Sequence, residues 1–135
     1  KNNRKLSSNF NVDSILKESQ LIKEVTVFTK LINANSIEDL KDIGNLLIQK
    51  VDKGIGVLAA DLEKPSIVVV VSNALVDIGV HAGIIAKDLG SMMGGGGGGR
   101  PNMATAGGKN KKSLNSALEK AQDVIKKNLE GKNAV

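Results

Sequence analysis

The chain has 135 residues, of which 41% are hydrophobic, and a formal net charge of +5. This length suits one domain with a substantial core, and with only two aromatic residues that core must be aliphatic. This composition argues against a platform that stacks bases on exposed aromatic rings. The absence of cysteine excludes disulfides, thiolate zinc sites and a cysteine nucleophile, and it indicates a cytoplasmic or organellar compartment.

The longest apolar run, Ile67–Val71, is too short to span a bilayer, so we expect no membrane partner. Because the chain begins with Lys1 rather than Met, we expect a piece of a longer polypeptide. Of the 19 basic and 14 acidic residues, eight basic and three acidic residues lie after position 99. The first 99 residues are thus neutral and the whole positive excess follows them, which favours an anionic partner over a merely solvated basic helix.

Residues 1–22 are predicted to form a polar tail and the end of a helical segment, because apolar residues recur at helical spacing from Val12 to Leu21 or Ile22. Residues 23–135 are predicted to form the globular domain. Within it, residues 23–32 alternate as a strand does. Ser36 with Asp39 resembles a capping box at the start of a helix over residues 37–51, which Gly54 ends.

The second half of the domain continues with two strands, residues 55–62 and 67–71, joined by a tight turn and hence antiparallel. Asp77 is predicted to cap a helix over residues 78–93, whose glycines suggest close backbone packing. Ser113 is predicted to cap a basic helix over residues 114–129. The order β-α-β-β-α, a glycine-rich loop over residues 94–108 and a C-terminal basic helix predict an α/β fold, an α+β sandwich with a small mixed sheet.

The chemistry for catalysis or metal binding is sparse. His81 is the only histidine, so a His/Cys metal site is excluded and no metal is expected. We expect His81 to bond a nearby loop rather than to bind an anion or act in catalysis. The glycine-rich segment fits neither a P-loop, because Met103–Asn110 lacks the first glycine and the final hydroxyl, nor a dinucleotide fingerprint, because it follows a helix.

The glycine-rich segment is predicted to be a packed loop rather than a linker. Arg100-Pro101 and the small residues 103–106 interrupt it, and a second glycine pair follows, none of which a linker needs. Without a Cβ, glycine lets the backbone approach an anion or a helix closely. The residues assigned to this structural or backbone-binding loop are His81, Gly83, Gly94, Gly95, Gly96, Gly97, Gly98, Gly99, Gly107 and Gly108.

Two motifs carry a family resemblance: HAG at residues 81–83 and GGGGGGRPNMATAGGK at residues 94–109. They closely resemble the signature near the carboxyl end of alanyl-tRNA synthetases, with Asn102 where aspartate is usual. The order of elements from about residue 24 to 110 is also similar to that family's C-Ala domain, which is related to a nucleic-acid-binding module of DHH phosphoesterases. The resemblance implies a non-catalytic domain that binds the tRNA elbow and supports aminoacylation and editing by the parent enzyme.

The resemblance also implies the partners: tRNA, with alanine tRNA expected, and the other domains of the synthetase. The domain itself is expected to need no cofactor, whereas the parent would use ATP, magnesium and a zinc editing site. The charge distribution and the resemblance together assign tRNA contacts to Arg100, Asn102, Lys109, Lys111, Lys112, Lys120 and Lys127.

Two alternatives stay open. In the first, the glycine-rich loop and the helix carrying Gly79 and Gly83 pack against a second copy of the chain, which makes the domain a homodimerisation module. In the second, the chain is an accessory nucleic-acid-binding domain of a DHH-type phosphoesterase, whose metal motifs would lie upstream.

Overall fold

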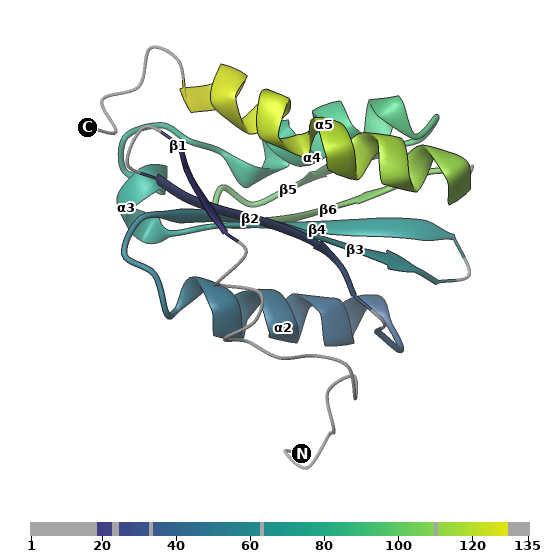
Figure 1. Cartoon of the computed structure of the whole chain (residues 1–135), viewed down its shortest axis with the longest axis horizontal. Coiled ribbons are helices and arrows are strands. Elements are labelled where there is room, and N and C mark those ends of the chain that lie inside the picture. Colours follow the sequence, from purple (N-terminus) through teal and green to yellow (C-terminus); the bar gives the residue numbers. More distant parts are fainter. Residues whose placement is uncertain (1–18, 23–24, 33, 63, 110, 130–135) are drawn as a thin grey trace.

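The computed structural model describes residues 19–22, 25–32, 34–62, 64–109 and 111–129. In this part of the chain a mixed sheet of six strands lies between helix α2 on one face and helices α4 and α5 on the other (Figure 1). The helices are α2 (Ile37–Ile48), α3 (Asn73–Val76), α4 (Ala82–Met92) and α5 (Lys111–Leu129). The strands are β1 (Gln20–Ile22), β2 (Val25–Leu31), β3 (Gly54–Asp61), β4 (Pro65–Val71), β5 (Gly96–Gly99) and β6 (Met103–Gly107).

The strands lie in the order β1-β2-β3-β4-β6-β5. β2 and β3 are parallel, because α2 crosses over between them, and every other neighbouring pair is antiparallel. The predicted α/β class and the antiparallel pairing of the two central strands are confirmed, although the sheet is larger than the predicted one. β3 and β4 are buried on both faces, as their almost continuous apolar sequences require.

The start of α2 follows the predicted capping box. The Ser36 hydroxyl accepts a hydrogen bond from the Asp39 N–H at 3.1 Å, and the Asp39 carboxylate accepts one from the Asn35 N–H at 3.2 Å. Two N–H groups at the helix start are thereby satisfied. The helix ends at Ile48, earlier than predicted, and Gly54 begins β3 instead of ending the helix.

Three other sequence predictions are wrong. Leu21 lies in strand β1, not at the end of a helix; the rest of the predicted N-terminal helix, residues 12–18, lies outside the described residues. Asp77 is the C-cap of the short helix α3, and α4 starts later, after His81. Gly79, with φ +102°, separates the two helices because this backbone conformation cannot continue a helix.

The third wrong prediction concerns the glycine-rich segment, which is a β-hairpin rather than a loop. β5 consists only of glycines and pairs with β6 through four residue pairs, from Gly96 with Gly107 to Gly99 with Ala104. α5 also begins three residues earlier than predicted. The hairpin extends the sheet beyond β4 and so determines the shape of the surface considered next.

The core has two layers, one on each face of the sheet. The larger layer lies under α4 and α5, where Ile85, Leu89 and Ile125 are fully buried. The smaller layer lies under α2, where Phe28, Leu40 and Leu58 pack together. β6 contributes its alanines to the larger layer and Met103 to the edge of the smaller one, so Met103 and Thr105 lie on the α2 face of the sheet.

Candidate nucleic-acid interface

The glycines between α4 and β6 have different structural tasks. Gly94, with φ +74°, ends α4 in a Schellman motif: its N–H bonds Ser91 O, and the next N–H, of Gly95, bonds Gly90 O. Along β5 the glycines then alternate between the two faces of the sheet. A Cβ on Gly97 would lie 2.5 Å from Ala86 O in α4, whereas a Cβ on Gly98 would meet no atom within 4 Å.

This alternation explains how one all-glycine strand serves two purposes. On one face, Gly97 lets the backbone of β5 touch the backbone of α4. Gly83 and Gly90 of α4 contribute to the same close contact, because a Cβ on either would clash with the backbone of β5. On the other face, Gly96 and Gly98 leave the sheet bare. The predicted close packing of the glycines in this helix is therefore confirmed, and the partner is β5 of the same chain.

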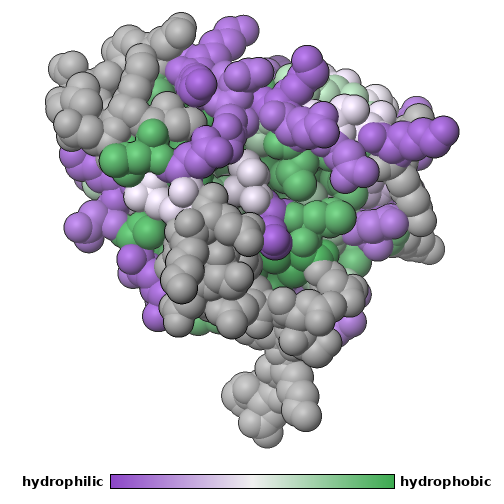
Figure 2. Space-filling model, in the orientation of Figure 1, coloured by the Kyte–Doolittle hydropathy of each residue, from purple (hydrophilic) through white to green (hydrophobic). Residues whose placement is uncertain are grey.

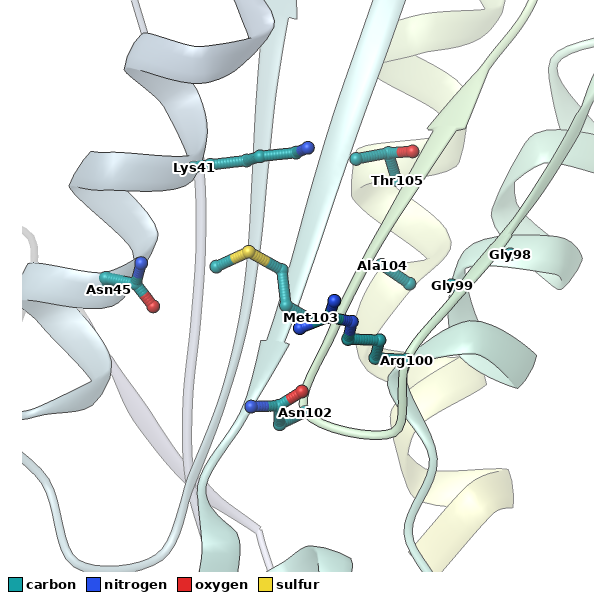
Figure 3. A pocket seen from close by; sticks show the side chains of 9 residues that line it. All are labelled: Lys41, Asn45, Gly98, Gly99, Arg100, Asn102, Met103, Ala104 and Thr105. Atoms are coloured by element: carbon teal, nitrogen blue, oxygen red, sulfur yellow. The ribbon is translucent and has the colours of Figure 1, made fainter.

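The bare part of the sheet lies beside α2. α2 packs on β3 and β4 and leaves β6 and β5 uncovered on its face of the sheet. A groove of about 510 Å³ results, with the hairpin as its floor and α2 as one wall (Figure 3). It is lined by Lys41, Asn45, Gly98, Gly99, Arg100, Asn102, Met103, Ala104 and Thr105.

The lining of the groove is cationic and polar. Lys41 extends from α2 towards Thr105 on β6, and Arg100 extends from the hairpin turn towards Met103 (Figure 3). Asn45 and Asn102 add amide donors and acceptors, and among the residues that the structure describes no carboxylate lines the groove. Lys41 and Arg100 lie beside the glycine strand β5, an arrangement that suits the phosphodiester backbone of a nucleic acid. The nucleic acid can approach the glycines closely, because they have no side chains, while the two cations offset its negative charge.

The turn that carries Arg100 and Asn102 is held from three sides. Arg100 N–H bonds Met103 O at 2.9 Å across the hairpin. Val71 N–H, at the end of β4, bonds Asn102 O at 2.9 Å, and Ala82 N–H, at the start of α4, bonds Pro101 O at 2.8 Å. These bonds fix the backbone of the turn, and they therefore fix the points from which the Arg100 and Asn102 side chains extend into the groove.

The structure divides the residues predicted to contact tRNA between the two faces. Arg100 and Asn102 line the groove. Lys109 follows β6 and bonds Met93 O at the end of α4 through its N–H. The other four belong to α5, across the sheet, although the placement of the Lys111 side chain lies outside what is described. The remaining three, Lys112, Lys120 and Lys127, are exposed on α5. Hydrophilic side chains project along the upper side of the molecule in Figure 2, where α5 lies in Figure 1.

Lys127 also has acidic neighbours. It lines a second cavity, of about 430 Å³, between α4 and α5, together with Asp88 and Asp123. Two carboxylates beside one lysine make this a poor place for a phosphate. The groove beside α2 therefore has the better electrostatic match to RNA.

His81 has the structural role that the sequence favoured, with a different partner. It is the N-cap of α4, and its Nδ1 accepts a hydrogen bond from Gly83 N–H at 3.0 Å. Gly83 is buried, and a Cβ there would lie 2.9 Å from Gly99 O of β5. The helix surface proposed for packing against a second copy is thus occupied within the chain.

Lys41, Asn45 and Thr105 were missed by the sequence reasoning. Lys41 and Asn45 are one helical turn apart on α2, beside the apolar positions, which is a detectable but weak signal. In the described ranges no group of three or more His, Asp or Glu side chains could hold a metal ion. No helix in the same ranges has the length and apolar character needed to cross a membrane.

Comparisons with known proteins give the family. The DHHA1 domain profile matches residues 24–127. Alanine–tRNA ligase of Alkaliphilus metalliredigens is 37% identical over 125 residues, and that of Natranaerobius thermophilus is 36% identical over 121. These matches cover 92% and 89% of this chain but only 14% of each ligase.

Among solved structures, the C-Ala domain of Aquifex aeolicus alanyl-tRNA synthetase has the same fold. It superposes with a TM-score of 0.73 at 24% identity, covering 81% of this chain and 98% of that domain. The profile match spans most of the chain and includes the helix, hairpin and groove described above. The chain belongs to the DHHA1 domain family.

Proposed function

We propose that this domain binds tRNA through the groove between α2 and the β5–β6 hairpin. The observation that carries the proposal is the lining of this groove, in which the described residues combine Lys41 and Arg100 with a glycine floor and include no carboxylate. The net charge of +5 supports an anionic partner. The resemblance to alanine–tRNA ligases makes tRNA the appropriate RNA.

Binding would depend on the shape and backbone of the RNA. The lining that the structure describes contains no aromatic ring for stacking, and its donors suit phosphate and 2′-hydroxyl groups. We therefore propose that the domain binds the elbow, a structural feature that tRNAs share, and that it has little preference for one tRNA over another. In a parent synthetase, such a contact would hold the tRNA for aminoacylation and editing, while the chemistry would take place in other domains.

A salt titration of tRNA binding tests the proposal. Affinity for the intact chain should fall as salt rises, by about 0.7 to 0.9 log units per log unit of salt for each phosphate contacted. Arg100→Ala should weaken binding about tenfold and reduce the slope by about one contact, because a charge-assisted hydrogen bond is lost. The matched control is Lys120→Ala, an exposed cation on the opposite face, which should leave both quantities nearly unchanged.

Two outcomes would count against the proposal. If the intact chain shows no salt-dependent binding of tRNA, the proposed function is wrong. Loss of affinity in Lys120→Ala with none in Arg100→Ala would keep RNA binding but place it on α5.

A further inference from the structure

The first turn of α4 connects His81 to the hairpin turn that carries Arg100. Two consecutive N–H groups at this helix start are satisfied differently. Gly83 N–H bonds the ring of His81, whereas Ala82 N–H bonds Pro101 O, in the hairpin turn. The histidine cap therefore orders the same helical turn that holds the RNA-facing hairpin in place.

The contact between these segments is tight enough to transmit a displacement. A Cβ on Gly83 would lie 2.9 Å from Gly99 O, so the backbones of α4 and β5 touch directly beside the cap. Gly99 precedes Arg100, and both line the groove. A change in the first turn of α4 must therefore change the contact that supports this end of the groove.

We propose that His81 is a positioning residue for RNA binding, and that protonation of its ring loosens the attachment of the hairpin turn to α4, one of the three that hold it, and so weakens binding. This proposal rests on the proposed function of the groove. As an acceptor at Nδ1, the neutral ring carries its proton on Nε2; the imidazolium has donors at both nitrogens and can no longer accept from Gly83 N–H. Histidine is the side chain that ordinarily changes charge between about pH 5 and 8.

The direction in which RNA affinity changes on protonation of His81 distinguishes positioning from a direct electrostatic effect. The charged residues on the elements around His81 are Asp77 at the end of α3, Lys87 and Asp88 on α4, and Arg100 in the hairpin turn. Protonation adds a positive charge to the domain, which by itself would tighten binding to an anionic RNA. Loss of the cap acts in the opposite direction, so positioning by His81 requires that binding weaken in acid.

The test compares two substitutions at two pH values. His81→Asn keeps a side-chain oxygen that caps well and does not titrate, whereas His81→Ala removes the cap. At pH 7.5 and constant ionic strength, tRNA affinity should match wild type in His81→Asn and fall about threefold to tenfold in His81→Ala, the range expected for a lost cap. When the pH is lowered to 5.5, the wild-type affinity should fall towards that of His81→Ala, and the affinity of His81→Asn should stay unchanged.

The chain contains a single histidine, so no other imidazole contributes in the untagged protein, and His81→Asn controls for every other titrating group. A wild-type affinity that rises at pH 5.5 would overturn the proposal, as would equal losses in His81→Asn and His81→Ala at pH 7.5. If His81→Ala fails to fold, the comparison of wild type with His81→Asn across pH still decides.

An NMR titration of the free protein separates this proposal from the proposed function. Between pH 7.5 and 5.5, the amide resonances of Ala82, Gly83 and Arg100 should shift together in the wild type and stay fixed in His81→Asn. A chain that binds no tRNA but shows these coupled shifts would refute the proposed function and keep the positioning role. A shift of the Gly83 amide without one at Arg100 would refute the positioning role.

Discussion

The two faces of the sheet differ in how fully helices cover them. α4 and α5 close one face and bury the larger core layer, whereas α2 covers only the central strands of the other. Strand β5 takes part in both arrangements: Gly97 meets α4, and Gly98 faces open space. Because successive residues of a strand point to opposite faces, these two adjacent glycines have different roles. Gly97 packs on α4, and Gly98 belongs to the proposed binding surface.

Adding one methyl group to the α4 face of β5 should have the largest effect on stability. Gly97→Ala should destabilise the domain by about 1–3 kcal/mol, because its Cβ would lie 2.5 Å from the backbone oxygen of Ala86. The matched control Gly98→Ala should change stability by less than about 0.5 kcal/mol, since its Cβ enters open space. Urea unfolding measures both, and equal losses would show that the two faces of β5 are not distinct.

A charge placed on the open face tests the proposed RNA contact. Gly98→Asp should lower tRNA affinity at least tenfold, which corresponds to about 1.4 kcal/mol. The new carboxylate would lie in the groove and repel the phosphates that we propose Lys41 and Arg100 to contact. Gly98→Asn has nearly the same size and no charge, and should lose much less. A fluorescence titration of both variants separates charge from bulk, and indistinguishable affinities would argue against phosphate at the floor of the groove.

The wall of the groove should depend on the cap of α2. Ser36→Ala should reduce the free energy of unfolding by about 1 kcal/mol, because the Asp39 N–H loses its side-chain acceptor. Ser36→Asn should restore most of that loss. Chemical denaturation checks both values, and an unchanged stability in Ser36→Ala would show that the cap contributes little to this helix.

The smallest effect is expected from the cation on α2. Lys41→Ala should weaken tRNA binding about threefold, less than Arg100→Ala, because a lysine is a flexible point charge and Arg100 sits on a fixed turn. Lys41→Arg should retain most of the affinity. A salt titration gives the comparison, and an unchanged affinity in Lys41→Ala would confine the RNA contact to the hairpin.

Local signals in the sequence predicted some elements well. Ser36 with Asp39 marked the start of α2, and the apolar strands β3 and β4 were found because both of their faces are buried. Asp77 misled because an aspartate before an apolar run resembles an N-cap, while the helix break at Gly79 depends on its positive φ.

The groove was only partly predictable. Strand periodicity is read from side chains, so a run of glycines gives no such signal, and β5 becomes a strand through its pairing with β6. Arg100 and Asn102 were predicted from the charge distribution and the family resemblance, and both line the groove. Lys41 was missed because it meets the hairpin only after α2 packs on the sheet, a tertiary arrangement that spacing along the chain does not reveal.

The central claim, that RNA occupies the half-covered face, is tested most directly by mapping the contact in solution. Amide resonances of the labelled chain would be followed while unmodified alanine tRNA is added. We expect the shifts and broadening to centre on Gly98, Arg100, Asn102 and Thr105, with Lys41 affected and the exposed residues of α5 unaffected. Perturbations confined to α5, with the hairpin unchanged, would contradict the account.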